Sequence, residues 1–356
     1  MTQRSGMIDW DFAVATGSRL AGQGPVVSRA EADEVVAELR EGAYSSTPLV
    51  REFTGLVAEE GTAEVVIVDR QGWIQANADG FAQIITPLID KLEERKGAPS
   101  GLAKAIGSKV TGLEVGTLFG FLAGKVLGQF DPFYAPAGST EVGRLLLVAP
   151  NIVHTERELH VNPSDFRLWV CLHEETHRVQ FTAVPWMRDH IHSEIMSIVD
   201  TVETDPAKLA DLLGDTVKKL GDVLRGKEDA SLVELFSSPA QLEVIDRITG
   251  VMSLLEGHAD VVMDDVGPEV ITTVGEIRDR FNVRRKGAGP LDRFLRKMLG
   301  LDAKMAQYRN GATFVRGVID EVGMEGFNKV WVEPANLPSR TEIADPAAWV
   351  RRVHGS

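Results

Sequence analysis

Two histidines and a glutamate stand close together in the segment 173–177, in the order His-Glu-x-x-His. His173 and His177 are four residues apart, so their side chains point from one face of a helix. Two imidazoles placed in this way can bind one zinc ion at about 2.0–2.1 Å each. Glu174 follows the first histidine, where it can act as the general base that takes a proton from the water activated by the metal. The motif predicts the centre of a zinc-dependent hydrolase.

The residues around this motif favour the helix that it needs. Asn162 suits the N-cap, Pro163 suits the first helical position, and Asp165 suits the first turn. From Phe166 to Phe181 there is neither Pro nor Gly, which predicts a helix of about five turns through the motif. The charged residues Glu175 and Arg178 depart from the stricter zinc-peptidase pattern. They leave open the alternative of a solvated helix face with two ordinary histidines.

A catalytic zinc site needs a third protein ligand and an open fourth position. The best candidate is Glu256, which lies in the apolar-periodic segment 242–262. Asp260 is four residues further on and shares its face, so it can accept the spare N–H of a ligating histidine, for which His173 is our candidate. His258 points elsewhere on the same helix. His258 and Asp260 both remain alternatives for the third ligand, because zinc accepts imidazole nitrogen as well as carboxylate oxygen.

The fold class expected from the sequence is α+β and mostly helical, with a small β-sheet lobe, a helical lobe and the metal site between them. We expect an N-terminal lobe at residues 1–185 with the sheet and the His-Glu-x-x-His helix, and a helical C-terminal lobe at 186–356 with the third ligand. Residues 64–69 and 144–149 are expected to be strands. The second lies just ahead of the motif helix and is expected to be an edge strand that pairs with extended substrate.

Two further segments carry structural expectations. Glycines at every fourth position from 112 to 128 predict a tightly packed internal helix, since a bare stripe lets another backbone approach. Residues 7–27 are expected to form an irregular arm, and the tail with Trp331 and Trp349 is expected to cover the surface.

Composition limits the classes of partner. The net charge of −14 over 356 residues makes general nucleic-acid binding a poor hypothesis. No stretch reaches the length of a membrane span, and no apolar run of signal-peptide type follows Met1. The single cysteine, Cys171, excludes an internal disulfide and is expected to be buried core. These features predict a cytoplasmic protein that binds neither membrane nor nucleic acid; the oligomeric state stays open.

Several segments together resemble an actinobacterial family of zincin-like metallopeptidases. The segments are 69–73 with Asn77, 128–133, 172–181, 256–260, and 307–309 with Gly311 and Phe314. The resemblance implies a zincin-like fold and a zinc-dependent hydrolase. The arrangement of His-Glu-x-x-His followed by Glu-x-x-x-Asp also resembles the wider glutamate-zincin group. That resemblance implies Glu256 as the third ligand and Asp260 as a carboxylate that supports the ligands. Some family members are labelled as associated with biosynthesis of a deazaflavin coenzyme, which supplies no substrate.

The predicted reaction is hydrolysis of a peptide bond in a peptide or protein substrate, with Zn²⁺ as cofactor. A second donor to the oxyanion is usual in such reactions, and Tyr308 and His190 are the candidates. Two other hypotheses stay open. One is a zinc hydrolase of a small amide or ester, and the other is a catalytically silent zincin scaffold that binds a partner. Manganese, cobalt or nickel could also occupy such a site in vitro.

Overall fold

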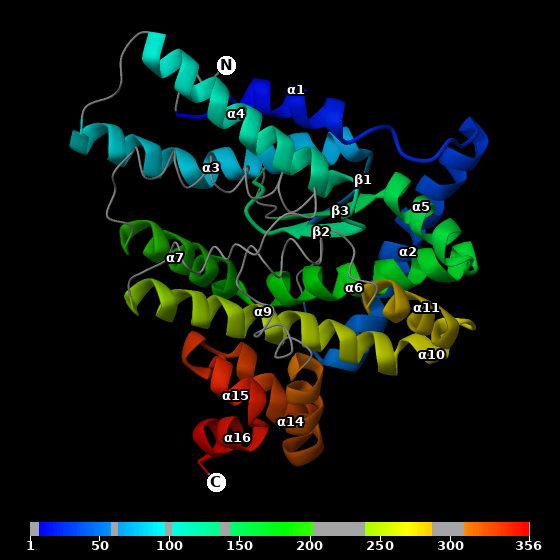
Figure 1. Ribbon diagram of the computed structural model, residues 1–356. Helices are drawn as coiled ribbons and strands as arrows, with labels where there is room; N and C mark the ends of the chain where they lie inside the picture. The colour runs from blue at the N-terminus through cyan, green and yellow to red at the C-terminus, as the bar shows by residue number, and fades with distance from the viewer. Residues whose placement is uncertain are drawn as a thin grey trace.

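The computed structural model describes residues 7–57, 63–96, 102–135, 143–201, 239–286 and 310–355. These segments form mostly helices with one small sheet (Figure 1). The elements in chain order are α1 (Trp10–Leu20), α2 (Arg29–Thr54), β1 (Glu64–Val68), α3 (Arg70–Lys96), α4 (Leu102–Ala123), β2 (Gly128–Asp131), β3 (Arg144–Val148), α5 (Ala149–Leu159), α6 (Pro163–Ala183), α7 (Pro185–Thr201), α9 (Pro239–Asp265), α10 (Gly267–Val270), α11 (Val274–Lys286), α14 (Asn310–Phe327), η2 (Asn328–Trp331), η3 (Pro334–Asn336), α15 (Arg340–Ala344) and α16 (Pro346–His354). The α+β, mostly helical fold class is confirmed.

The sheet has three strands in the order β1-β3-β2, with β1 parallel and β2 antiparallel to β3. The expectation that the strand at 144–149 lies at an edge is therefore wrong, because β3 is the central strand. Its run from Leu145 to Val148 is buried throughout, as expected of a strand covered on both faces. The short strand β2 is an edge instead.

The two faces of β3 contact two different hydrophobic clusters, because side chains alternate along a strand. Leu146 and Val148 pack with α1, α3 and α4 on one side of the sheet. Leu145 and Leu147 join the larger cluster on the other side, which includes residues of α2, α6, α9 and the C-terminal helices. In Figure 1 the sheet accordingly lies between an upper group of helices (α1, α3, α4) and the helix α6 below it.

The glycine stripe packs α4 against α1, as the expected close approach of backbones requires. A Cβ added at Gly116 would lie 2.4 Å from the carbonyl oxygen of Ala13, and one at Gly120 would lie 2.8 Å from that of Gly17. Two expectations are wrong in part. Helix α4 ends at Ala123, so Gly128, the last glycine of the series, belongs to β2. Residues 10–20, which were expected to belong to an irregular arm, form α1. Glycine at these places permits close helix packing and does not break the helix.

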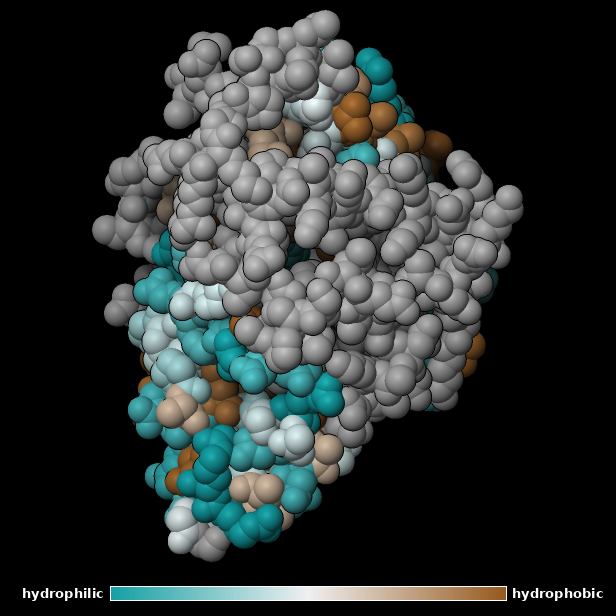
Figure 2. All heavy atoms as spheres, turned by 60° about the vertical axis from the view of Figure 1, so that its left-hand side comes forward, coloured by the Kyte–Doolittle hydropathy of each residue, from teal (hydrophilic) through white to brown (hydrophobic). Residues whose placement is uncertain are grey.

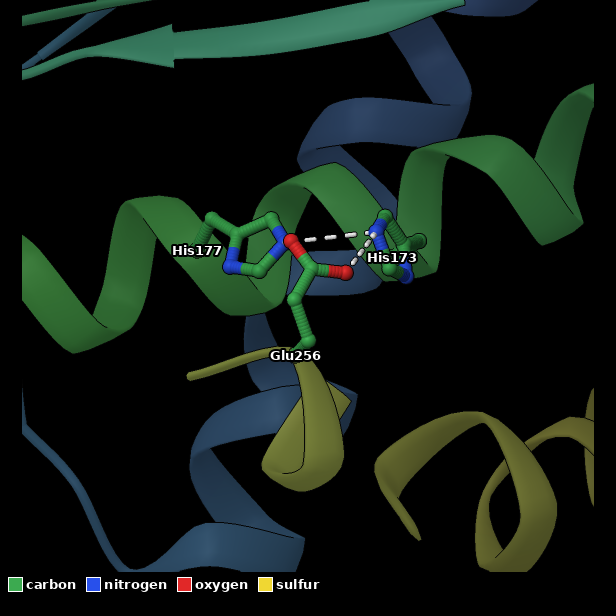
Figure 3. A group of neighbouring side chains, drawn as sticks. All are labelled: His173, His177 and Glu256. Atoms are coloured by element: carbon green, nitrogen blue, oxygen red, sulfur yellow. Dashed lines mark hydrogen bonds and ion pairs between the residues drawn. The ribbon is translucent and has the colours of Figure 1, made fainter. Parts of the chain in front are cut away.

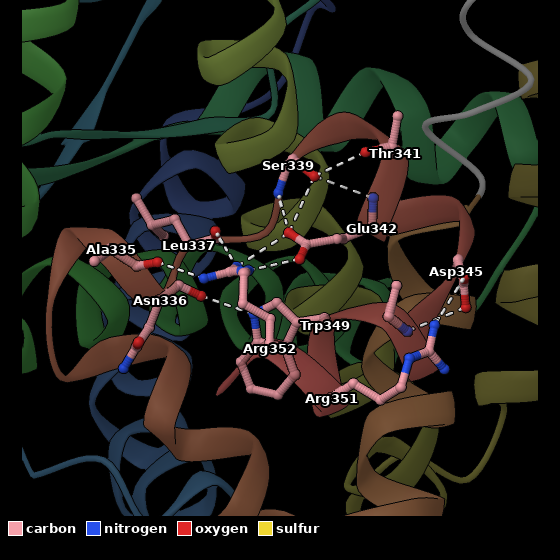
Figure 4. Close-up of polar contacts among 11 residues, drawn as sticks. Ala335, Asn336, Leu337, Ser339, Thr341, Glu342, Asp345, Trp349, Arg351 and Arg352 are labelled. Atoms are coloured by element: carbon pink, nitrogen blue, oxygen red, sulfur yellow. Dashed lines mark hydrogen bonds and ion pairs between the residues drawn. The ribbon is translucent and has the colours of Figure 1, made fainter. Parts of the chain in front are cut away.

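The C-terminal segment folds into short helices below α9 (Figure 1). The expectation that it merely covers the surface is wrong, because Trp349 is completely buried and donates Nε1–H to the carbonyl of Asn336. Glu342 forms a capping box with Ser339 and pairs with Arg352, which also donates to two backbone carbonyls (Figure 4). These contacts hold the segment as an ordered part of the fold.

The boundary expected between lobes at residues 185 and 186 stays a prediction; the larger hydrophobic cluster contains residues from both sides of it. In the described part of the chain, no helix combines the length and the apolar character required to cross a membrane. On the face shown in Figure 2, the lower end, formed by the C-terminal helices, is mostly hydrophilic.

Candidate metal centre

Helix α6 forms as its sequence predicts. The Asn162 side chain accepts a hydrogen bond from the backbone N–H of Asp165, and Pro163 occupies the first turn. The helix continues through the His-Glu-x-x-His motif to Ala183. Phe166 and Leu172 before the two histidines and Val179 after them are buried in the larger cluster. The helix is therefore anchored on both sides of the two histidines.

His173, His177 and Glu256 converge at one place (Figure 3). The Nε2 atoms of the two histidines are 3.2 Å apart. Glu256, which α9 presents from the opposite side, places one carboxylate oxygen 3.5 Å from His177 Nε2 and the other 3.8 Å from His173 Nε2. Each of the three side chains is partly exposed. They form the cluster of potential metal ligands found among the described residues.

These separations fit a tetrahedral zinc ion. With bonds of about 2.0–2.1 Å, neighbouring ligand atoms of a tetrahedron lie roughly 3.3 Å apart. The two nitrogens are 3.2 Å apart, and each has a different oxygen of Glu256 at 3.5 or 3.8 Å, so a rotation of the carboxylate is enough to present one oxygen at a comparable distance from both. Two imidazole nitrogens and one carboxylate oxygen are also donors that zinc prefers, and three protein ligands leave a fourth position for water or substrate. The residues present fit the metal that the motif predicts.

Glu174 is buried next to this cluster, with 7% of its surface exposed. The carboxyl group packs against β2, where a Cβ added at Gly128 would lie 2.5 Å from its Cδ. Burial raises the pKa of Glu174 to about 7; attraction to His177 lowers it and repulsion from Glu256 raises it. A carboxyl group with such a pKa can exchange a proton near neutral pH.

Glu175 and Arg178 form a buried ion pair on another side of α6. Two hydrogen bonds of 2.8 and 2.7 Å join the guanidinium to the carboxylate, which is completely buried. Arg178 also donates to the carbonyl of Ala63 and to the hydroxyl of Thr47 on α2. The alternative of a solvated helix face is therefore wrong. The two charges attach α6 to α2 and to the segment before β1.

The other predicted site residues lie outside the cluster of three ligands. His258 is fully buried behind Glu256 on α9, with Nδ1 3.0 Å from Gln180 Nε2; burial, followed by the charge of His177, lowers its pKa to about 3. Asp260 is partly exposed on α9, and its backbone carbonyl accepts a hydrogen bond from Arg278. Its role towards His173 stays a prediction.

The two candidates for a second oxyanion donor also stay predictions. Tyr308 lies outside the described residues. His190 is on α7, where its ring packs edge-on against Trp186 at 5.9 Å between centroids, and burial lowers its pKa. Cys171 is completely buried, as expected, and burial raises the pKa of its thiol.

Three residues near the ligands were not found from the sequence. Gln180 accepts from His177 Nδ1 at 3.0 Å, and Met263 places its sulfur 3.2 Å from His173 Nδ1. Gly128 packs against Glu174, the predicted general base. The spacing of Gln180, three residues after a ligand on the same helix, could have indicated its position, because residues three apart are neighbours on a helix.

This chain belongs to the family of zincin-like metallopeptidases, whose family model matches residues 8–350. Among solved structures it is similar to a protein from Chloroflexus aurantiacus, described as "a putative hydrolase with a novel fold". The two chains are 30% identical, with a TM-score of 0.71, over 98% of this chain and 99% of the other. No curated protein matches.

Proposed function

We propose that this protein is a zinc-dependent metallopeptidase. The observation that carries the proposal is the convergence of His173, His177 and Glu256, whose potential ligand atoms all lie within 4.8 Å of one another. Catalytic zinc sites use three protein ligands of these types and keep a fourth position open. Membership of the zincin-like metallopeptidase family and the likeness to a structure described as "a putative hydrolase" support the same conclusion.

In this proposal the three ligands hold the ion, and Glu174 moves the proton. When bound, zinc supplies a Lewis acid that acidifies water and polarises a carbonyl group. The Glu174 carboxylate takes the proton from the attacking water and delivers it to the leaving amine. The position of Glu174 supports this role, because its carboxyl group is buried next to the three ligands and against the edge strand β2.

The strand β2 supports a peptide as substrate. It is an edge of the sheet, and its first residue, Gly128, contacts Glu174 directly. An extended chain can add to a sheet edge through main-chain hydrogen bonds, which give affinity with little demand on sequence. A peptide that paired along Gly128–Asp131 would bring a peptide bond to the base and the ligands. We therefore assign to β2 the substrate-pairing role expected of the strand at 144–149.

The alternative of a catalytically silent scaffold draws on the charges of Glu175 and Arg178, which depart from the stricter zinc-peptidase pattern. These two residues are buried as a pair against α2 and contribute no atom to the cluster of His173, His177 and Glu256. The hydrolase of a small amide or ester uses the same metal chemistry and differs only in substrate, so the substrate test below separates it from the peptidase.

The test is hydrolysis of a mixed peptide library, followed by mass spectrometry, with zinc-loaded protein. We expect cleavage that is lost on chelation and restored by zinc. Glu174→Gln should retain zinc, measured by metal analysis, and lose cleavage by at least about a hundredfold, since a general base contributes roughly that much. Cleavage of small esters or amides without cleavage of any peptide would overturn the peptidase assignment, and an unchanged rate for Glu174→Gln would remove Glu174 from the base role.

A further inference from the structure

The side chain of Gln180 is buried between α6 and α9 with its amide fully engaged. Its Oε1 lies 3.0 Å from Nδ1 of His177, on the preceding turn of α6. Its Nε2 lies 3.0 Å from the backbone carbonyl oxygen of Leu255 and 3.0 Å from Nδ1 of His258, both on α9. An amide has two N–H donors and a carbonyl acceptor, so these three contacts use both donors and the acceptor.

The contact with Leu255 determines where the protons are. A backbone carbonyl can only accept, so the atom facing Leu255 must be the NH₂ nitrogen of Gln180. The same nitrogen therefore donates to His258 Nδ1, which must be unprotonated, and the neutral His258 ring carries its proton on Nε2. The remaining atom, Oε1, must accept from His177, whose proton is then on Nδ1. This leaves the lone pair of His177 on Nε2, the atom that faces His173 and Glu256.

The ring of His258 is held in place by aromatic packing. Its centroid lies 5.4 Å from that of Phe327 and 5.3 Å from that of Trp331, and its surface is completely buried. The acceptor that it offers to Gln180 is thus part of the rigid core. Leu255 is also buried and immediately precedes Glu256 in the chain. The amide of Gln180 therefore joins one metal ligand to the backbone beside another.

We propose that Gln180 is a positioning residue that, together with His258, holds His177 in the Nδ1–H tautomer and ties the helix of Glu256 to the helix of the two histidines. Hydrogen bonds to the outer nitrogen of a ligating histidine orient the ring and set its tautomer, and their loss typically reduces metal affinity 10–100-fold. A glutamine can do more than a carboxylate here, because it accepts from His177 while donating to α9. The proposal rests on the metal-binding part of the function proposed above.

The first test reads the tautomer in metal-free protein and needs no zinc. Histidine ¹⁵N NMR, with the His177 signals assigned through His177→Asn, should show His177 protonated on Nδ1. In Gln180→Leu this preference should be lost, whereas in Gln180→Glu it should persist, because a carboxylate still accepts from Nδ1. An unchanged His177 tautomer in Gln180→Leu would overturn the proposal whether or not the protein binds zinc.

The second test measures zinc affinity by chelator competition, with Co²⁺ absorption as a report on ligand geometry. We expect Gln180→Leu to bind zinc 10–100-fold more weakly. Gln180→Glu should bind with nearly normal affinity but should unfold at lower temperature, because it loses the donors to α9. Thr176→Val is the matched control, since Thr176 is an equally buried polar residue of α6 whose hydroxyl bonds to Leu172 within the helix.

His258→Phe keeps an aromatic ring next to Phe327 and Trp331 and removes the Nδ1 acceptor, together with the Nε2–H group, for which the described residues offer no hydrogen-bond partner. It should lower zinc affinity less than Gln180→Leu does, because the bond between Gln180 and His177 remains. Equal affinities for wild type, Gln180→Leu and His258→Phe would contradict the proposal. Failure of the wild type itself to bind zinc would overturn the proposed metallopeptidase function and leave the tautomer test standing.

Discussion

The backbone of Gly128 lies directly against the side chain of Glu174. A Cβ at Gly128 would lie 2.5 Å from both Cγ and Cδ of Glu174 and 2.8 Å from its Oε1. Carbon atoms cannot approach so closely, so any larger residue at the start of β2 must displace the carboxyl group. The edge strand β2 and the proposed general base Glu174 are therefore in direct contact, which is possible because residue 128 is a glycine without a side chain.

Replacement of Gly128 by Ala is expected to reduce kcat by about a hundredfold, because a displacement of about 1 Å in a reacting group can cost that much. The fold should be retained, since a side chain can move aside where a backbone cannot. The measurements are kcat on a peptide substrate and the zinc content.

The matched control for that substitution is Gly116→Ala, where the added Cβ would meet the backbone oxygen of Ala13 at 2.4 Å. This variant should lose stability while the site residues stay as they are. A normal kcat in Gly128→Ala would show that the contact with Glu174 does not control catalysis, and an equal loss of kcat in Gly116→Ala would show that the loss is not specific to that contact.

Glu174 should make the metal-free protein less stable as the pH rises. Its pKa is raised from 4.5 to about 7 in the folded state, so the folded state binds this proton more tightly than the unfolded state. The stability from that proton is fully present below pH 4.5 and is lost as the pH rises through about 7. A pKa difference of this size corresponds to roughly 3 kcal/mol.

The measurement is urea unfolding of wild type and Glu174→Gln with chelator present, at pH 5 and pH 8. Glutamine does not titrate, so the variant should be the more stable protein at pH 8, and its advantage should shrink at pH 5. Other ionisable groups are common to both proteins and cancel in the comparison, except His177 and Glu256, whose charges interact with Glu174. A stability difference that is the same at both pH values would contradict the burial of an ionisable Glu174.

Zinc should stabilise the folded protein through the ligands from both helices. Any ligand that binds only the folded state stabilises it by about 2.7 kcal/mol when its free concentration is about 100 times Kd. Thermal unfolding should therefore shift upward with zinc and return on chelation. In Glu256→Gln the shift should be much smaller, because one charged ligand is lost. Glu269→Gln, at an exposed position on α10, is the control and should behave as wild type. An equal shift in Glu256→Gln would remove Glu256 from the ligand set.

Arg178→Met should be strongly destabilising because it leaves the completely buried Glu175 without its charge partner. Removing one member of a buried pair typically costs about 3–5 kcal/mol. Replacing both residues by apolar ones should cost less than this single change, since no uncompensated charge remains.

Urea unfolding gives the free energy of unfolding of Arg178→Met and of the variant with both Glu175 and Arg178 replaced, with Arg316→Met as the comparison. Arg316 pairs with Asp264 and Asp265 while 41% exposed, and exposed pairs contribute about 0–1 kcal/mol. If Arg178→Met unfolds no more easily than Arg316→Met, the buried pair does not anchor α6.

Local features of this protein could be read from its sequence. The cap at Asn162, the proline after it and the uninterrupted run to Phe181 predict α6, because each acts on backbone groups within a turn. The glycine spacing predicts close helix packing for the same reason, since residues four apart share a face. The shared face of the two candidate ligands, His173 and His177, follows from that helix alone.

The tertiary structure decided everything that depends on contacts between distant segments. Strand order is one example, because β3 has apolar residues in a row whether it is central or at an edge, and only its pairing with β1 and β2 shows which. The charges of Glu175 and Arg178 indicate solvent exposure until a partner helix is seen to cover them.

The candidate metal centre likewise depends partly on local sequence and partly on tertiary packing. Residue types and spacing single out Glu256 as a candidate, but its approach to the histidines depends on how α9 packs against α6. The bonds from Gln180 to Leu255 and His258, and the contact of Gly128 with Glu174, likewise exist only after packing. Short-range propensities act over a few residues of one chain segment, whereas these contacts arise when the burial of apolar surface brings separate segments together.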